Sequence, residues 1–475
     1  MQPHIDILNI QVELTMRKLL AVLVVFIGII IGMIVVFNTT SIRPKQIKIT
    51  PVDNLPSYPT VAKRLAESIR FQTFADNTND AAFQGFHHWL EKNYSTLFNN
   101  PNIEWQRFQK HSLVAKWIGR SVNSTPLVLV ANQYVKEPDL TTVPEWKFNP
   151  FMGKKDDTYI YGRGTLGNKM TMLALLESLN NLVKQNTLPE RTIYFIFPHN
   201  LKGEQLIANA LKQAKIQPEF ILKVANCIGQ DFIPAINRPI AFIGTELSNL
   251  SEVDLTLQAA DAQLALENAV DHLKQALPTI DLASAPLQTF IDYLSPELGF
   301  QQQLIFANAW LLESSQVNYL NQNSFIKTIF GQELKANFTP IDSNNIATAR
   351  LSIKGFQSNK FQQWLADHIN NDAIKIGTVK AIHQTNTIAL QNRGYRILDK
   401  TIKEVFPNIL SMPTLANNTM SAKWIQTSPV YYFNPLLHTK ASWERAQNGI
   451  DDKISINNYE RVIQFYHQLL MNNIN

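Results

Sequence analysis

The sequence contains very little cysteine, and this absence removes two classes of architecture. Among 475 residues there is a single cysteine, Cys227. One thiol forms no internal disulfide and cannot supply the ligands of a cysteine-based metal cluster. The fold must therefore depend on hydrophobic burial, and a content of 45% hydrophobic residues over this length is enough for more than one core.

The chain also lacks a strong excess of charge of either sign. It carries 43 Lys and Arg against 38 Asp and Glu, which gives a formal net charge of +5, and the basic residues form no dense block. A small imbalance spread over a long chain does not make the basic face that nucleic acids bind. We therefore expect no nucleic-acid partner.

Several short catalytic motifs are missing as well. The ten histidines include no HExxH pair, and the chain has no glycine-rich phosphate loop. Ser248, Ser421 and Cys227 lack the flanking residues of an activated nucleophile. Any chemistry must come from residues that are far apart in the sequence.

What the sequence does contain is one long apolar run near its N-terminus. Residues 19–37 include no charge and are rich in Ile, Val and Leu. A helix of this length, at about 1.5 Å per residue, spans the hydrocarbon core of a bilayer. A buried core helix seldom excludes polar residues for so long, and a cleaved signal peptide usually has a shorter run followed by small residues. The sequence favours an uncleaved transmembrane anchor, with the signal peptide as the main alternative.

The orientation of this anchor does not follow from basic charge alone, because two basic residues precede the run and three follow it. A short N-terminus, one apolar helix and a large folded body are typical of a signal anchor. We therefore predict a single-pass membrane protein whose body lies outside the cytoplasm, in the periplasm if the source is bacterial. Either Met1 or Met16 fits as the start of this signal.

The pattern of apolar residues divides the rest of the chain into a tether and a folded body. Four prolines within residues 38–59 indicate an extended linker. Helix-like and strand-like segments then alternate, which is typical of an α/β fold with a mostly parallel sheet covered by helices, and the pattern changes after residue 250 to that of a smaller α+β domain. The predicted parts are an N-terminal segment (1–18), an anchor (19–37), a linker (38–59), the main domain (60–250 and 385–475) and an inserted lid or dimerisation domain (251–384).

Four short stretches, in this order and at these separations, resemble a known enzyme family. They are WKFNPF at 146–151, YGRGTL at 161–166 followed by Lys169, FANAWL at 306–311 and DKIS at 452–455. Over most of residues 60–470 the chain resembles the carboxypeptidase S and aminoacylase branch of the dizinc exopeptidases, clan MH, in the form that includes membrane-anchored N-acyl amino acid hydrolases. The resemblance implies a zinc-binding α/β domain interrupted by a lid or dimerisation domain.

The resemblance also implies five motifs that hold two zinc ions, and this sequence departs from each of them. Active members use His nitrogens and carboxylates as ligands, with a further Glu that takes a proton from metal-bound water. Here the positions of these ligands are held by Asn132, Gly167, Lys202, Lys223 and Asn448. Tyr134 stands where an Asp would orient the first His, and Leu201 stands where the general-base Glu would be.

These replacements remove the expected chemistry. A neutral amide is a poor zinc ligand, glycine supplies none, and a lysine repels a cation. We therefore expect no cofactor and a catalytically inactive relative, in which the two lysines pair with Glu204 or neighbouring acids and the body binds a peptide, an acyl-amino acid or a protein partner. The candidate ligand cleft consists of Arg163, Lys169, His199, Glu204, Lys327 and Asn337.

Two other interpretations stay open. A rebuilt site with one zinc held by shifted ligands such as His199, Glu204 and Asp231 would make the chain an active carboxypeptidase or amidohydrolase. The lid domain would alternatively form a homodimer, although the family's loop with a histidine that reaches across a dimer is missing between Ala260 and Asp261.

Overall fold

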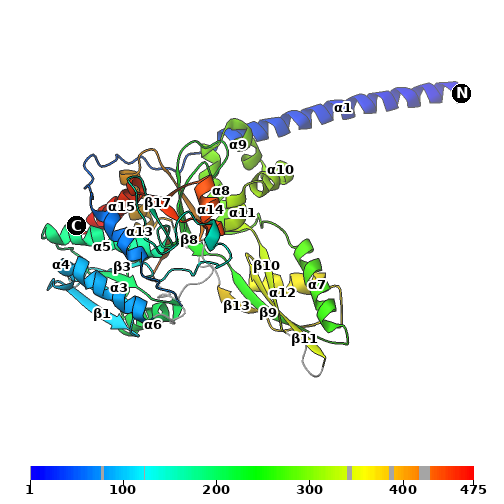
Figure 1. Ribbon diagram of the computed structural model, residues 1–475. Helices are drawn as coiled ribbons and strands as arrows, with labels where there is room; N and C mark the ends of the chain where they lie inside the picture. The colour runs from blue at the N-terminus through cyan, green and yellow to red at the C-terminus, as the bar shows by residue number, and fades with distance from the viewer. Residues whose placement is uncertain are drawn as a thin grey trace. The chain divides into compact units, whose positions relative to one another are not determined.

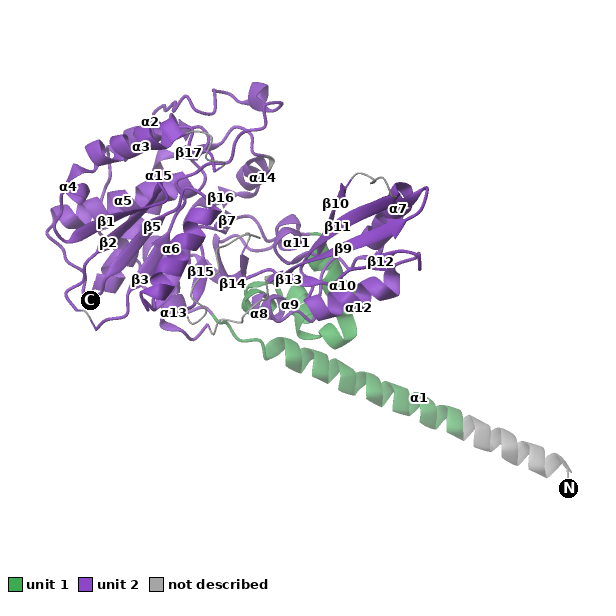
Figure 2. Cartoon of the chain, turned by 90° about the horizontal axis from the view of Figure 1, so that it is seen from below, with its two compact units in different colours: residues 1–45, 291–322 green, residues 46–290, 323–475 purple. Residues whose placement is uncertain are grey.

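The structure is a computed structural model that describes the chain except for residues 1, 76–79, 122, 340–344, 384–389, 417–427 and 475, and except for the side chains of residues 2–15, 383 and 448. The chain divides into two compact units (Figure 2). The smaller unit comprises residues 1–45 and 291–322, and the larger unit comprises residues 46–290 and 323–475.

Within its described residues, the larger unit contains a ten-stranded mixed sheet (Figure 1) with the strand order β1-β2-β5-β3-β6-β15-β8-β7-β16 and with β14 paired to β8. The strands β5, β3, β6 and β15 are parallel, whereas β1, β2 and β5 are antiparallel. The strands are β1 (Ile103–Phe108), β2 (Ser112–Trp117), β3 (Leu127–Val130), β5 (Ile193–Phe197), β6 (Phe220–Lys223), β7 (Ile228–Gln230), β8 (Ile240–Leu247), β14 (Leu410–Ala416), β15 (Val430–Tyr432) and β16 (Leu437–Thr439).

Helices cover both faces of this sheet, because alternate side chains of each strand point to opposite faces. In β3, Leu127 and Leu129 belong to the larger core with α5 and α15, while Val128 and Val130 belong to a second core with α6. The helices of this part are α2 (Val61–Ile69), α3 (Asp80–Asn93), α4 (Ser95–Phe98), the 3-10 helix η1 (Val143–Glu145), α5 (Asn168–Lys184), α6 (Leu201–Gln213), α13 (Arg393–Val405), α14 (Lys440–Asn448) and α15 (Ile456–Ile474); the strands β4 (Tyr159–Tyr161) and β17 (Lys453–Ser455) form a separate ribbon.

A second sheet in the larger unit has its own core. Its described strands follow the order β10-β11-β9-β12, with β13 also on β9, and all pairs are antiparallel. Two helices, α7 and α12, pack on it through residues such as Leu266 and Phe361. The elements are β9 (Leu250–Gln258), α7 (Ala262–Ala276), α11 (Ser324–Phe330), β10 (Glu333–Thr339), β11 (Ile346–Lys354), α12 (Ser358–His368), β12 (Lys375–Ile376) and β13 (Lys380–His383).

The smaller unit is helical. It contains α1 (Gln2–Thr40), the end of α8 (Ala285–Leu294), the 3-10 helix η2 (Ser295–Glu297), α9 (Phe300–Ala307) and α10 (Ala309–Asn321). One helix of the described part, residues 16–40 of α1, is long and apolar enough to cross a membrane, with a mean hydropathy of 3.4; a signal sequence near an N-terminus meets the same criterion.

These elements confirm the predicted α/β class with an apolar N-terminal helix. The sheet is mixed because β1 and β2 form an antiparallel hairpin at one edge, whose turn contains Gln109 and Lys110 at positive φ, and because β8 pairs antiparallel with β7 and β15. Helix α6 begins at Leu201, where the Asn200 side chain accepts a hydrogen bond from the Gly203 N–H and caps it. The domain boundaries stay predictions.

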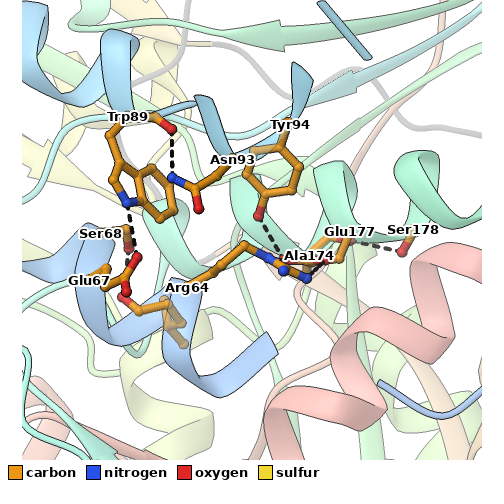
Figure 3. Close-up of polar contacts among 10 residues, drawn as sticks. Arg64, Glu67, Ser68, Trp89, Asn93, Tyr94, Ala174, Glu177 and Ser178 are labelled. Atoms are coloured by element: carbon orange, nitrogen blue, oxygen red, sulfur yellow. Dashed lines mark hydrogen bonds and ion pairs between the residues drawn. The ribbon is translucent and has the colours of Figure 1, made fainter. Parts of the chain in front are cut away.

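An ion pair between Arg64 and Glu177 fixes helix α2 against helix α5 (Figure 3). Arg64 donates two hydrogen bonds of 2.5 Å to the Glu177 carboxylate, and the Tyr94 hydroxyl donates a third of 2.7 Å. Glu177 is only 2% exposed. Bidentate contacts of this kind are both strong and specific in direction, so they set how α2 lies on the main sheet domain.

We predict that Glu177→Gln lowers the free energy of unfolding by about 3 kcal/mol, because the partly buried Arg64 guanidinium loses its counter-charge. Glu67→Gln is a matched control, since Glu67 accepts one hydrogen bond from Trp89 and is partly exposed. Its effect should stay below about 1 kcal/mol. Denaturant unfolding of the detergent-solubilised chain measures both, and equal losses would contradict the role given to Glu177.

Candidate functional site

The positions at which the resemblance places metal ligands meet at one edge of the main sheet. Lys223 ends β6, Asn132 follows β3, and Glu204 lies in the first turn of α6, which follows β5. The strand β3 is parallel to both β5 and β6, so the carboxyl ends of the three strands lie together. Open α/β sheets bind their ligands at this edge.

Lys223 forms an ion pair with Glu204 at this edge, as the sequence analysis expected. Lys223 Nζ lies 2.5 Å from Glu204 Oε1, and the two residues are 3% and 1% exposed. The carboxylate is in addition favoured by the N-terminus of α6. The ammonium and the carboxylate thus neutralise each other where little water reaches them.

The neighbouring ligand positions carry no group that suits zinc. Asn132 is buried, and its Oδ1 has no hydrogen-bond partner among the described residues. Its backbone N–H donates to Asn168 Oδ1 at 3.3 Å. Gly167 precedes α5, and a Cβ there would meet no atom within 4 Å. A side chain could therefore begin at this position without a clash, but glycine supplies no ligand.

The residues at the positions of the general base and its neighbours also lack the required chemistry. Leu201 is 38% exposed at the start of α6, and Lys202 beside it is exposed. Burial raises the pKa of Tyr134, and the negative charge of Glu204 raises it further. A phenol that keeps its proton does not act as a base at neutral pH. Asn448 ends α14, and its side chain lies outside the described residues.

These residues do not fit a dinuclear zinc centre. Zinc takes His nitrogen, Cys sulfur and carboxylate oxygen in a compact set. The described part of the chain contains no group of three or more His, Cys, Asp and Glu side chains placed to hold a metal ion. The shifted set of His199, Glu204 and Asp231 is therefore not brought together either.

A cavity of about 360 Å³ opens beside Tyr134. Its volume and its mixture of polar and apolar walls suit a small organic ligand. The polar part of its lining includes Tyr134, Lys136, Arg163, Asn168 and Asn226, and the apolar part includes Leu166, Phe325, Ile329 and Trp443.

Among the residues predicted for the ligand cleft, Arg163 lines this cavity. Its guanidinium donates to Asp452 Oδ2 and to the Gly449 carbonyl, both at 2.7 Å, and lies 5.0 Å from the Trp146 ring. Burial raises the pKa of Asp452 to about 6, although the charge of Arg163 opposes this. Arg163 therefore holds the segment before β17 against the cavity wall.

Lys169, Lys327 and Asn337 do not belong to the cavity lining. Lys169 is fully buried, donates to the Phe71 carbonyl at 2.7 Å and lies 4.9 Å from the Phe86 ring, and burial lowers its pKa to about 7. Lys327 and Asn337 are exposed on α11 and β10. Their assignment to a ligand cleft stays a prediction.

His199 belongs to a buried histidine cluster that the sequence analysis did not identify. The ring centres of His111 and His199, and those of His87 and His111, are 5.8 Å apart. Phe83 stacks on His111 at 5.0 Å, and His199 Nδ1 lies 2.7 Å from Ser112 Oγ. The pairing of β2 with β5 brings His111 close to His199, and α3 adds Phe83 and His87, so no local spacing in the sequence marks the cluster.

The histidines of this cluster are shielded from water. Burial lowers the pKa of His87 to about 4; the hydrogen bond with Gln133 opposes this, and the positive charge of Arg107 contributes to it. Burial likewise lowers the pKa of His199 to about 4, and His111 adds to this. Both rings are therefore neutral at physiological pH and act as packing groups and hydrogen-bond partners.

We predict that Glu204→Gln lowers the free energy of unfolding by about 3 kcal/mol, because the buried Lys223 ammonium loses its carboxylate. Lys202→Met, two residues away in the same helix and exposed, should change it by less than about 0.5 kcal/mol. Urea unfolding of the solubilised chain compares the two. A Glu204 variant as stable as the Lys202 variant would show that the buried pair is not formed.

We predict that stability falls between pH 6.5 and pH 4. In this window the unfolded chain protonates His87 and His199, whose ordinary pKa is 6.5, while the folded chain does not until about pH 4. The loss should be smaller for His87→Gln and unchanged for the exposed control His88→Gln. Unfolding curves at several pH values test this, and identical slopes for the wild type and both variants would rule it out.

Comparison with known proteins places this site in a family. A profile described as Peptidase family M20/M25/M40 matches residues 139–472, more than half of the chain. The probable carboxypeptidase S-like 2 of Dictyostelium discoideum is 27% identical over 94% of this chain and 92% of that protein. The N-fatty-acyl-amino acid synthase/hydrolase PM20D1 of Xenopus tropicalis is 26% identical over 87% of this chain and 85% of that protein.

Solved structures share the fold. The M20 family metallo-carboxypeptidase Sso-CP2 of Sulfolobus solfataricus superimposes with a TM-score of 0.54 and 16% identity, covering 87% of this chain and 99% of that one. Human carnosine dipeptidase 1 gives a TM-score of 0.55 and 12% identity, covering 87% of this chain and 96% of that one. At this level of identity the likeness concerns the fold alone.

These matches correct one expectation from the sequence. The sequence predicted no cofactor, with zinc only in the alternative of a rebuilt site. Members of the M20 family are metal-dependent, dinuclear zinc peptidases, so the expectation of no cofactor is wrong for a member, and zinc is the cofactor that membership implies. The resemblance to the carboxypeptidase S and aminoacylase branch is confirmed. The chain belongs to Peptidase family M20/M25/M40.

Proposed function

We propose that this protein is a membrane-anchored member of the M20 family whose inherited centre does not hydrolyse substrates and whose cavity binds a peptide, an acyl-amino acid or a segment of a protein partner. The observation that carries the proposal is the buried ion pair between Lys223 and Glu204. This ion pair lies at the sheet edge where hydrolysis would need zinc ligands and an unpaired carboxylate that acts as a base.

The chemistry of that edge supports the absence of turnover. Peptide and amide hydrolysis at such a centre requires a polarised water and a base within hydrogen-bond reach of it. Glu204 is held against an ammonium, and Leu201 offers no proton acceptor. A lysine ammonium at the sheet edge also repels a second cation. No described residue at the inherited positions takes the role of base.

The cavity and the relatives support a binding role. Its lining combines an exposed cation, Lys136, with aromatic and amide side chains. An acyl-amino acid or a peptide end offers a carboxylate that can pair with Lys136 and an apolar portion that can pack on the aromatic side chains. The names of the relatives refer to carboxypeptidases and to N-fatty-acyl-amino acid hydrolysis, which are compatible with ligands of this class.

The apolar N-terminal helix supports the anchor. Large side chains along the run, such as Leu19, Phe26 and Phe37, are 67%, 58% and 70% exposed. So much exposed apolar surface on one helix is unfavourable in water and favourable in a bilayer.

We predict that the full chain in lipid nanodiscs, supplied with Zn²⁺ or Co²⁺, releases no amino acid from N-acyl amino acids or dipeptides above the level of a protein-free blank. Because the metal is supplied, a lack of turnover would reflect missing catalytic groups and not a missing metal ion. The Xenopus relative, assayed in parallel, is the positive control. Turnover by this chain that disappears in Glu204→Gln would contradict the proposal.

We predict that N-acyl amino acids bind to the same preparation and that Lys136→Ala raises Kd about tenfold, because a carboxylate loses its charged partner. Lys155→Ala, an exposed lysine outside the cavity lining, is the matched control and should leave Kd unchanged. Calorimetric titration measures both. Equal affinities for the wild type and Lys136→Ala would show that the ligand does not use this cavity.

A further inference from the structure

A segment of the smaller unit lacks charge although much of it is exposed. Between Glu297 and Glu313 no residue carries a charged side chain. This segment covers α9 and the beginning of α10. Surface helices of soluble proteins normally carry charged residues on their outer face. The composition of this segment is therefore unusual for a surface in contact with water alone.

Three large apolar side chains protrude from the uncharged segment. Phe300 is 59% exposed, Trp310 is 58% exposed and Leu311 is 50% exposed. We call these three residues the apolar collar. Single exposed apolar residues are common, but a group of this size on one short segment marks a site that another apolar surface covers.

Asn308 ties this segment to the end of the apolar run in α1. Asn308 is completely buried, and its Nδ2 lies 3.2 Å from Thr39 Oγ1 and 3.3 Å from the Val35 carbonyl. Its Oδ1 accepts a hydrogen bond of 3.1 Å from Asn38 Nδ2. The α1 residues that turn toward α9 are spaced as one helical face, because Ile31, Val35, Asn38 and Thr39 are partly or fully buried.

The start of the linker contacts the residues just before the uncharged segment. Lys45 Nζ lies 3.1 Å from Asp292 Oδ2, on the side of the uncharged segment that precedes Glu297. Both side chains are about half exposed, so this pair is a water-facing contact. Charged residues thus lie on both sides of the segment in the sequence, while residues 298–312 carry no charge.

We propose that the apolar collar inserts into the headgroup region of the bilayer that α1 crosses. The protein is then attached to the membrane at two places, by a transmembrane helix and by an interfacial patch. This inference rests on the proposed membrane anchor. If residues 19–37 span the hydrocarbon core, then Val35 to Thr39 lie at its boundary, and Asn308 fixes the collar at that level. Tryptophan favours this region, since its ring is apolar and its N–H reaches polar groups.

Site-directed spin labelling of the full chain in phosphatidylcholine vesicles tests the proposal. The single native cysteine is buried, so a Cys227→Ala background accepts one label at a time. Labels are placed at Trp310→Cys in the collar, at Phe26→Cys within the apolar run and at Glu313→Cys on the charged border. Collision rates with oxygen, which enters lipid, and with a nickel chelate, which stays in water, are measured for each.

The proposal predicts an oxygen-to-nickel ratio at Trp310 that is several-fold higher than at Glu313 and lower than at Phe26. A ratio at Trp310 equal to that at Glu313, with Phe26 in lipid, would overturn the collar and leave the anchor intact. A low ratio at Phe26 would overturn the anchor itself. A Trp310 label shielded from both reagents would show that protein, such as a second copy, covers the collar, and would also overturn the proposal.

As a second measurement, Phe300→Cys should give the same result as Trp310→Cys, because it reports on the collar from α9 while Trp310 stays in place. Agreement between the two sites supports insertion of the whole patch. A lipid-exposed label at Trp310 with a water-exposed label at Phe300 would reject the collar as defined.

Discussion

Two opposite charges, those of Lys223 and Glu204, are buried together at the carboxyl edge of the main sheet, and the rest of the site follows from this contact. In a setting with little water each charge depends on the other, so replacing either one alone is costly. The contact therefore stabilises the fold although Lys223 stands at the position of a metal ligand.

The scaffold persists because its cores do not depend on the altered positions. The side chains of β3 pack into two apolar layers whether or not a ligand follows the strand at Asn132. The loop before α5 keeps its shape for a similar reason. Gly162 has a φ of 126°, and a Cβ there would lie 2.5 Å from the Pro150 carbonyl oxygen, so glycine is needed for geometry alone.

Local patterns in the sequence predicted much of this fold, because hydrophobic period and buried runs reflect which face of an element is covered. The alternation of helices and buried strands around the main sheet follows from such patterns. The candidate site was predicted only in part. The buried cluster around His111 and the hydrogen bonds of Asn308 join residues that are distant in the chain, and neither leaves a local signal.

A double-mutant cycle on the buried pair provides the sharpest test, with Lys223→Met, Glu204→Met and the double variant unfolded in denaturant. We expect each single change to be strongly destabilising and the double variant to recover most of the loss, because two apolar side chains replace two mutually dependent charges. Strictly additive losses would contradict this expectation, since they would mean that Lys223 and Glu204 do not stabilise each other at the inherited centre.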